Sequence, residues 1–318
     1  MQRIAVLGVG DWGRSLASLL ARLGHQVTLW GRQATVERIS ENLQVTNELA
    51  QALEGADLVV ESVTSQGLRP VLKKMMEILT KPLPLVITSK GIEQGTGWLL
   101  PEVALEVMGS QSRKSIGILS GPSLAKEVNA HLPTSVVAAA YTPPFTLKIQ
   151  QTFNAPLFRV YPNHDIQGVA FGGAMKNIIA IACALSDGLG FGENARAALI
   201  TRGLHEIRKL STLKSCQEHS LNGLAGVGDL IATCLSLSSR NYQFGTYLAQ
   251  GLSPQEAKEK VGKVVEGAYT CRSVKEMSEE SGIPVPITEA IYAILYEGKS
   301  PGEAVDHLLS RLVKLEHL

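Results

Sequence analysis

A lysine stands near the start of a segment that is otherwise almost entirely apolar. Residues 171–185, FGGAMKNIIAIACAL, have the composition of a buried helix, and Lys176 and Asn177 lie near its N-terminal end. Because lysine is rarely buried without a partner, Lys176 either reaches solvent at the helix end or faces a polar cavity. In such a cavity, a lysine whose pKa is lowered by burial can protonate a developing alkoxide.

A second group of polar residues suits an anion and a carbonyl oxygen. Asp229 and Thr233 are four residues apart and share one face of a helix that we predict over 228–236. Arg240 and Asn241 follow a serine-rich turn, and an arginine offers a fork of donors that matches a phosphate. The spacing leaves an alternative open, in which Asp229 caps its helix and Arg240 lies on a solvated surface.

The N-terminal region contains a glycine-rich turn with the spacing of a dinucleotide site. The sequence GVGDWG lies between a predicted strand over 3–7 and a predicted helix over 14–23, the context that G-x-G-x-x-G requires. We expect Gly8 to make the tight turn, Gly10 to admit a pyrophosphate, and Gly13 to let helix and strand pack closely. The pyrophosphate then lies on the helix N-terminus, where free N–H groups favour negative charge.

The end of the second predicted strand bears on the choice of nucleotide. An NAD site usually places an Asp or Glu there to hold the ribose 2′-hydroxyl, but this strand ends in Trp30-Gly31-Arg32. Arg32 is suited to a 2′-phosphate, although a solvated surface arginine is the alternative. We therefore expect NADP to be accepted, with NAD as a second or alternative cofactor.

The pattern of strands and helices predicts the scaffold for these residues. Up to about residue 163, strands alternate with helices, which indicates an α/β fold with a doubly wound, mostly parallel sheet of the Rossmann type. The predicted strands cover 3–7, 26–30, 56–62, 83–89, 116–119, 134–140 and 158–161, with helices over 14–23, 67–79 and 124–129. Further helices are predicted over 167–186, 193–212, 228–236, 240–250, 254–261, 267–281, 286–297 and 301–313. We therefore expect a dinucleotide-binding domain over 1–165 and an all-helical substrate domain over 166–318.

Two strand ends carry polar residues toward the expected ligand. Lys90 follows the strand over 83–89, and ligands of open α/β sheets gather at the carboxyl ends of the strands. Ser120-Gly121-Pro122-Ser123 follows another strand. Pro122 suits the first turn of the helix predicted over 124–129, whose free N–H groups are able to hold an amide or a phosphate.

Composition narrows the functional class. A formal net charge of +1 argues against a protein that coats nucleic acid or anionic membrane. We find no apolar run that spans a bilayer without a charge or a Gly/Pro break, and we expect no stable membrane insertion. The four cysteines form no C-x-x-C pair and the histidines show no metal-ligand spacing, so we expect reduced thiols, no metal and a cytoplasmic location.

Long motifs along nearly the whole chain resemble the bacterial NAD(P)-dependent glycerol-3-phosphate dehydrogenases. The motifs are GVGDWG, LWGR, SKGIE, SGPSLAKEV, GGAMKNIIAIACALSDGLGFGENARAALITRG, GLAGVGDLIATCLSLSSRNYQFG and KVVEGAYT. The resemblance implies reversible reduction of dihydroxyacetone phosphate to sn-glycerol 3-phosphate by NAD(P)H, feeding glycerophospholipid synthesis. It also suggests a homodimer. The alternatives are a related dehydrogenase for another small 2-oxo or hydroxy acid, and a cofactor-binding sensor without catalysis.

The resemblance also implies roles for individual residues. Lys176 would exchange a proton with the C2 oxygen, Asp229 would support Lys176, and Lys90 would lie between nicotinamide and substrate. The implied cofactor contacts are Gly8, Gly10, Asp11, Trp12, Gly13, Arg32, Lys90, Ala125, Arg240, Val264 and Glu266. The implied substrate contacts are Lys90, Gly121, Ser123, Lys176, Asn177, Asp229, Thr233, Ser239, Arg240 and Asn241.

The sequence departs from the family pattern at two places. Asp11 stands where serine is commoner, which places an acid near the pyrophosphate. The segment Ser62-Val63-Thr64-Ser65-Gln66 replaces a V-P-S type of loop that flanks the cofactor. These departures leave open how both segments contact the cofactor.

Overall fold

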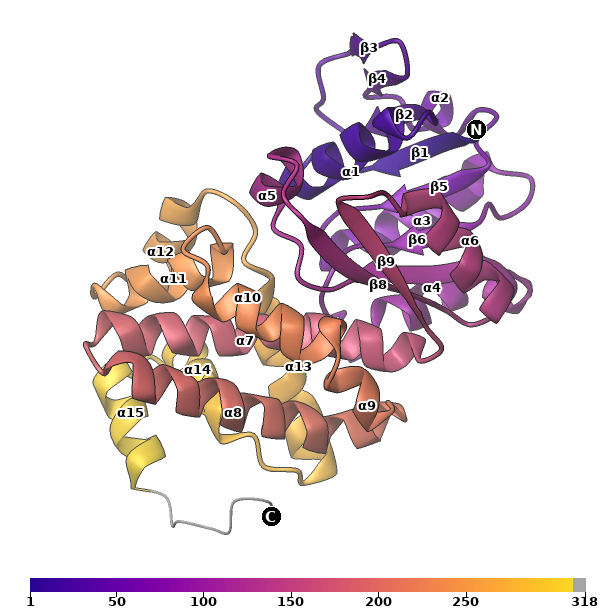
Figure 1. Cartoon of the computed structure of the whole chain (residues 1–318). Helices are drawn as coiled ribbons and strands as arrows, with labels where there is room; N and C mark the ends of the chain where they lie inside the picture. The colour runs from indigo at the N-terminus through magenta and orange to yellow at the C-terminus, as the bar shows by residue number, and fades with distance from the viewer. Residues whose placement is uncertain (311–318) are drawn as a thin grey trace. The chain divides into compact units, whose positions relative to one another are not determined.

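The computed structural model describes residues 1–310, which form two compact units (Figure 1). The sheet unit comprises Met1–Ala174 and Ser211–Asp229, and the helical unit comprises Met175–Leu210 and the chain from Leu230. Residues 311–318, including the end of the helix predicted over 301–313, lie outside the described part. The two units divide within helix α7 (Ile166–Gly188), and residues 211–229 return to the sheet unit.

The sheet unit is built on nine strands in the order β3-β4-β2-β1-β5-β6-β7-β8-β9. The strands are β1 (Arg3–Leu7), β2 (Gln26–Trp30), β3 (Glu37–Ser40), β4 (Leu43–Thr46), β5 (Leu58–Glu61), β6 (Leu85–Ile87), β7 (Ile116–Ser120), β8 (Thr134–Ala140) and β9 (Phe158–Asn163). All neighbouring pairs are parallel except β3 with β4 and β7 with β8. The predicted mostly parallel sheet is therefore confirmed.

Helices cover the two faces of this sheet. The helices are α1 (Asp11–Arg22), α2 (Leu49–Leu53), α3 (Leu68–Ile78), α4 (Leu100–Met108), α5 (Ala125–Asn129), α6 (Pro143–Phe153) and α9 (Glu218–Leu221). Ile4 and Val6 of β1 belong to a core that α1 and α6 complete. Because successive strand residues point to opposite faces, the equally buried Ala5 and Leu7 belong to the other face.

Several elements of the sheet unit were not predicted. The edge strands β3 and β4 are missing from the sequence prediction, as are helices α2, α4, α6 and α9. The parallel strands β2 and β4 are joined by residues 31–42, which contain β3 and no helix, although such connections usually carry one. All four residues of β3 are exposed, so the apolar alternation that marks a half-buried strand is absent there.

Glycines in the first half of α7 permit a close approach to the sheet. A Cβ atom at Gly173 would lie 2.7 Å from Ser120 Oγ, and one at Gly172 would lie 2.8 Å from the Ala225 carbonyl oxygen.

By length and composition α7 is able to cross a membrane, and the bent pair Glu218–Leu235 with Arg240–Ala249 passes the same test. The apolar stretch of α7 is wholly buried within the protein, as in the core helix of a soluble protein.

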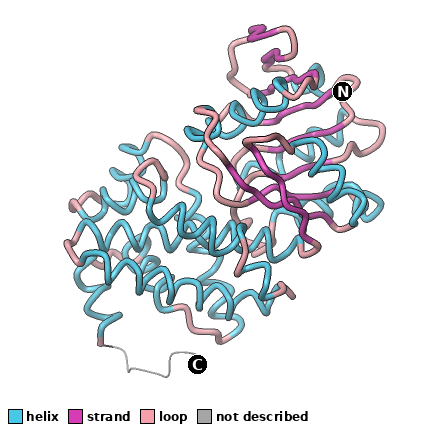
Figure 2. Tube along the Cα trace, viewed as in Figure 1, coloured by secondary structure: helices cyan, strands magenta, loops and turns pink. Residues whose placement is uncertain are grey.

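The helical unit is built from helices alone among its described residues (Figure 2). Besides the second half of α7 they are α8 (Gly192–Ser211), α10 (Asp229–Leu235), α11 (Arg240–Ala249), α12 (Pro254–Val261), α13 (Glu266–Ser281), α14 (Pro286–Tyr296) and α15 (Pro301–Leu309). All of these helices were predicted, with ends that differ by at most a few residues within the described range. Local signals account for this agreement, since α12 begins with a capping box of Ser253 and Glu256 and with proline at its first position.

Candidate active site

The glycine-rich turn joins β1 to α1, and its three glycines meet different surroundings. Gly8 has φ +122°, and a Cβ atom there would lie 2.3 Å from the Ser62 carbonyl oxygen. A Cβ atom at Gly13 would lie 1.9 Å from the Gly8 carbonyl oxygen, so this glycine lets α1 pack against the turn. A Cβ atom at Gly10 would meet nothing within 4 Å. The backbone at Gly10 therefore faces open space, as the approach of a pyrophosphate requires.

The start of α1 has the features of an anion site. Gly10 is the N-cap and makes no side-chain capping bond, so the positive end of the helix is left for a ligand. The buried indole nitrogen of Trp12 has no hydrogen-bond partner among residues 1–310, and a polar group of a bound nucleotide would satisfy it. These observations fit a dinucleotide. Asp11 is exposed in the first turn, so its charge is screened by water.

The end of β2 places Arg32 on the surface beside this turn. A Cβ atom at Gly31 would lie 2.5 Å from the side chain of Val9, which shows how closely the two loops approach. The Gly31 amide donates to the Thr46 carbonyl oxygen, and the Trp30 indole donates to the Asn47 carbonyl oxygen. The strand end is therefore held firmly, and Arg32 extends from it into solvent.

Lys90 lies just beyond β6 and forms a partly buried ion pair that the sequence did not reveal. Its Nζ atom lies 2.6 Å from Asp229 Oδ2 and donates to the Gly121 carbonyl oxygen at 2.9 Å. Asp229 is 1% exposed. Asp229 forms this ion pair with Lys90, and its implied support of Lys176 stays a prediction. Asp229 therefore fixes the Lys90 ammonium at the carboxyl edge of the sheet.

The turn after β7 differs in part from the prediction. Helix α5 begins at Ala125 with Leu124 as its N-cap, so Pro122 precedes the helix and the expectation of a first-turn proline was wrong. Gly121 has φ +126°, and its carbonyl oxygen accepts from Ser123 Oγ at 2.9 Å. The Ala125 carbonyl oxygen in turn accepts from Ser15 Oγ of α1 at 3.4 Å. This turn therefore connects the Lys90 region with the glycine-rich turn.

The helical unit gathers a second polar group around Lys176. Lys176 is 7% exposed, and its Nζ atom donates to Thr233 Oγ1 of α10 at 2.7 Å. The adjacent Asn177 accepts from Asn241 Nδ2 of α11 at 2.9 Å. Asn241 Oδ1 accepts from the backbone amide of Gly267 in α13, also at 2.9 Å. Residues from three other helices thus hold this part of α7. The alternative in which Lys176 reaches solvent is wrong, because its side chain is buried.

The remaining predicted substrate and cofactor residues lie at the ends of α11 and α13. Ser239 is the N-cap of α11 and accepts from the Tyr242 amide at 3.4 Å. Arg240 is exposed, and it donates to the carbonyl oxygen of the partly exposed Val264 at 3.2 Å. Glu266 opens α13. The exposed Arg240 is therefore placed to meet an anion from solvent, and its contact with a substrate stays a proposal.

Sequence reasoning missed a set of polar residues in the sheet unit. Gln66 Nε2 donates to the Ile92 carbonyl oxygen, and its Oε1 accepts from the Gln94 amide. These bonds join the atypical segment 62–66 to the loop that carries Lys90. Glu61 is fully buried at the end of β5. A charged residue inside the apolar run ADLVVES was the available signal for it.

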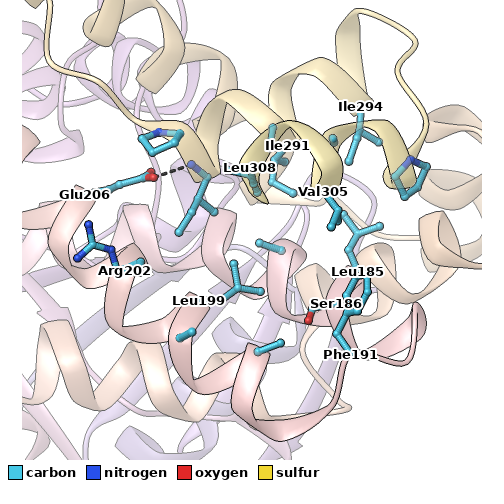
Figure 3. Close-up of a pocket in the computed structure, with 18 of the residues that line it drawn as sticks. Leu185, Ser186, Phe191, Leu199, Arg202, Glu206, Ile291, Ile294, Val305 and Leu308 are labelled. Atoms are coloured by element: carbon cyan, nitrogen blue, oxygen red, sulfur yellow. Dashed lines mark hydrogen bonds between the residues drawn. The ribbon is translucent and has the colours of Figure 1, made fainter. Parts of the chain in front are cut away.

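An apolar pocket of about 820 Å³ lies within the helical unit, lined by α8, α14 and α15 among other segments (Figure 3). None of the predicted substrate or cofactor residues lines it. On its wall, the buried Glu206 carboxylate accepts from the Ile287 amide at 2.5 Å and from the Thr288 amide at 3.3 Å. Glu206 thereby caps the N-terminus of α14, and burial raises its pKa to about 7.

The raised pKa of Glu206 makes a prediction about stability. The advantage of a group whose pKa is raised on folding is complete below its unfolded value of about 4.5 and is lost as the pH rises through about 7. We expect the free energy of unfolding of wild type, relative to Glu206→Gln, to fall by at most about 3 kcal/mol between pH 5 and 8. Urea denaturation at several pH values measures it. A difference that does not change with pH would contradict the raised pKa.

Glu256 supplies a control of opposite sign. This exposed carboxylate accepts hydrogen bonds from the amide and the hydroxyl of Ser253, and these bonds lower the pKa of Glu256. The stability of wild type relative to Glu256→Gln should therefore increase as the pH rises through the lowered pKa.

No cluster of three or more His, Cys, Asp or Glu residues suited to a metal ion occurs within the described part of the chain. All four cysteines are free thiols. The groups that the structure places around Lys90 and Lys176 are lysine ammonium groups, hydroxyls, amides and the Asp229 carboxylate.

Comparison with known proteins identifies the family. The profile of the NAD-dependent glycerol-3-phosphate dehydrogenase N-terminus matches residues 3–42 and 35–145, and that of the C-terminus matches residues 165–306. Glycerol-3-phosphate dehydrogenase [NAD(P)+] of Protochlamydia amoebophila is 51% identical over the full length of both chains. The enzyme of the same name from Chlamydia muridarum is 50% identical over 100% of this chain and 99% of the relative.

A solved structure agrees with these relatives. The crystal structure of glycerol-3-phosphate dehydrogenase from Coxiella burnetii matches with a TM-score of 0.91 and 36% identity. The match covers 98% of this chain and 99% of that one. The chain combines a Rossmann-type sheet with a helical C-terminal half, and it contains the Lys90 and Lys176 clusters. It belongs to the NAD-dependent glycerol-3-phosphate dehydrogenase family.

Proposed function

We propose that this chain catalyses the reversible reduction of dihydroxyacetone phosphate to sn-glycerol 3-phosphate with NADPH or NADH. The observation that carries the proposal is the buried Lys176 ammonium, held by Thr233 beside the fixed Asn177 amide. A carbonyl oxygen that becomes an alkoxide needs such a proton donor. The names of the full-length relatives at about half identity support the choice of substrate.

The sheet unit binds and orients the cofactor. Gly10 and the N-terminus of α1 would hold the pyrophosphate, and Arg32 would bind the adenosine ribose. The bound nicotinamide supplies the hydride. Lys90, fixed by Asp229 and by the Gly121 carbonyl oxygen, would contact the nicotinamide and the substrate.

The helical unit binds the substrate and moves the proton. Arg240, with Ser239 and Asn241 next to it, holds the phosphate group by charge-assisted hydrogen bonds. As the hydride reaches C2, the Lys176 ammonium gives one proton to the C2 oxygen and becomes a neutral amine, which regains a proton from solvent. In the reverse direction the neutral Lys176 removes the hydroxyl proton from glycerol phosphate.

The product fits a supply role for lipid synthesis. sn-Glycerol 3-phosphate carries two free hydroxyl groups beside its phosphate, so reactions that transfer acyl groups are able to consume it. We therefore propose that the reaction runs toward glycerol phosphate in the cytoplasm and feeds glycerophospholipid synthesis.

The experiment that tests the function is a comparison of initial rates of NADPH and NADH oxidation. We expect saturable oxidation with dihydroxyacetone phosphate and little with dihydroxyacetone or with 2-oxo acids such as ketopantoate. Faster turnover of an unphosphorylated 2-oxo acid would favour a related dehydrogenase. Absence of oxidation with every substrate would favour a cofactor-binding sensor.

Arg240→Ala should mainly weaken the binding of the phosphate substrate. A charge-assisted hydrogen bond contributes about 1.5–3 kcal/mol, so we expect the KM for dihydroxyacetone phosphate to rise about tenfold or more. Initial rates over a range of substrate concentrations measure it. Arg272→Ala, which removes an exposed arginine paired with Glu276 in the same unit, is the matched control. An unchanged KM in Arg240→Ala would place the phosphate elsewhere.

Arg32→Asp should change the choice of nucleotide. Replacing the cation by a carboxylate repels a 2′-phosphate and offers an acceptor to a 2′-hydroxyl. We expect the ratio of kcat/KM for NADPH to that for NADH to fall by about tenfold or more. An unchanged ratio would show that Arg32 does not face the ribose.

A further inference from the structure

Glu61 occupies a position where a carboxyl group needs an explanation. It ends β5 and lies in register between Leu7 of β1 and Ile87 of β6, both fully buried. Just beyond these two residues the chain enters the glycine-rich turn and the loop that carries Lys90. Glu61 is itself 0% exposed, and burial raises its pKa to about 7. An acid here is costly unless its hydrogen bonds are satisfied.

The hydrogen bonds of Glu61 join the loops that follow β5 and β6. Its Oε1 atom accepts from the Val63 amide at 2.7 Å and lies 2.5 Å from Ser89 Oγ. Ser89 Oγ also lies 2.6 Å from the Val63 carbonyl oxygen. The Glu61 carbonyl oxygen accepts from the amide and the hydroxyl of Thr88. Glu61, Val63 and Ser89 therefore form a closed ring, which we name the strand-end clamp.

A count of protons shows that the clamp needs a protonated carboxyl. The Ser89 hydroxyl has one hydrogen but lies within hydrogen-bond distance of two oxygen atoms, on Glu61 and Val63. If Glu61 donates to Ser89 Oγ, Ser89 is able to donate to the Val63 carbonyl oxygen and both contacts are satisfied. An ionised Glu61 leaves one of them without a hydrogen. Glu61 Oε2 has no hydrogen-bond partner among residues 1–310, which a neutral acid tolerates better than a carboxylate.

The clamp acts on two segments of the proposed site. Ser62, between Glu61 and Val63, packs its carbonyl oxygen against Gly8, where a Cβ atom would approach to 2.3 Å. Ser89 immediately precedes Lys90. We propose that Glu61 is a protonated positioning residue whose clamp fixes the backbone beside Gly8 and the base of Lys90. This inference rests on the proposed function for its importance to the cofactor, but the clamp itself is testable without it.

Two substitutions open the clamp by different routes. Glu61→Val replaces the carboxyl group by an apolar side chain that suits a buried parallel strand. Ser89→Ala removes only the hydroxyl. Hydrogen exchange of the protein without cofactor should show the Val63 amide exchanging about tenfold faster or more in Glu61→Val. Exchange over residues 62–66 should also be faster in Ser89→Ala. Unchanged exchange in both variants would overturn the clamp, whatever the enzyme's activity.

Cofactor titration tests the consequence. We expect the Kd for NADPH, followed by nucleotide fluorescence, to rise about tenfold in both variants, which corresponds to about 1.4 kcal/mol. Glu61→Gln keeps an acceptor for the Val63 amide but has no donor for Ser89 at the same atom, so its Kd should lie between those of wild type and Glu61→Val. Ser112→Ala removes another buried serine hydroxyl of the sheet unit, bonded to the Met108 carbonyl oxygen, and should leave the Kd unchanged.

A purely structural role makes a different prediction. It requires Glu61→Val to lower the urea midpoint, whereas an apolar residue in this apolar environment should leave the midpoint unchanged or higher. In the double variant Glu61→Val/Ser89→Ala, the effects on the Kd should be less than additive, because either change opens the same ring. Additive effects, or a wild-type Kd in Ser89→Ala, would overturn the proposal. Failure of wild type to turn over dihydroxyacetone phosphate would instead refute the proposed function, while the exchange result would still decide the clamp.

Discussion

Lys176→Ala should lower kcat by about 10²–10⁴-fold, the range expected when a positioned proton donor is removed. Lys176 is 7% exposed and donates to Thr233. The sequence of α7 contains no second lysine that could replace it. The glycine-rich turn and Arg32 belong to the sheet unit and are untouched by the substitution. We therefore expect the Kd for NADPH to change by about twofold or less. Stopped-flow turnover and fluorescence titration measure the two quantities.

Lys275→Ala is the matched control for this experiment. Lys275 lies on α13 of the same unit and pairs only with the exposed Glu279 among the ion pairs described. Its loss should leave kcat unchanged. Near-normal turnover in Lys176→Ala would remove this lysine from the mechanism, and a large loss of NADPH affinity would show that its role is in cofactor binding.

The second large effect concerns the stability of the Lys90–Asp229 ion pair. Removing one partner of this partly buried pair takes from the other charge an ion pair that its burial makes costly to lose. Asp229→Asn should reduce the free energy of unfolding by about 2–4 kcal/mol, and Lys90→Met should do the same. In the double variant the loss should be smaller than the sum, because either single change already removes the same ion pair. Urea denaturation of the four proteins completes the cycle.

The outcome of this cycle separates two descriptions of Asp229. The sequence analysis left open that Asp229 only caps its helix. In that case, the stability loss of the double variant would equal the sum of the two single losses. Additive losses would therefore contradict the ion pair as the main role of Asp229 in the folded protein.

Local signals carried most of the fold prediction. The limits of α12 follow from the capping box at Ser253 and the proline after it. The turn at Gly8–Gly13 is set by contacts within a few residues of itself and by Ser62. Strand β1 is apolar from Ile4 to Leu7, and the apolar residues of β2 alternate with Gln26 and Thr28. Apart from the contact with Ser62, these features are readable because the residues that cause them are neighbours in the sequence.

What the sequence did not show depends on contacts between distant segments. Lys90 and Asp229 are separated by 139 positions, and no periodicity links them. Asn241 meets Asn177 and Gly267 across 64 and 26 positions. Strand β3 is an exposed edge whose pairing with β4 gives no apolar alternation. The position of Pro122 before α5 was misread because a short helix carries few boundary signals.

The most direct test of the account is the fate of the cofactor's hydride. With NADPH deuterated at the transferred C4 position and dihydroxyacetone phosphate, the wild-type protein should place deuterium on C2 of sn-glycerol 3-phosphate. Nuclear magnetic resonance of the product measures it. One deuterium at C2 for each NADPH oxidised is the predicted result. Oxidation of NADPH without deuterium in glycerol phosphate, or no oxidation, would contradict the account.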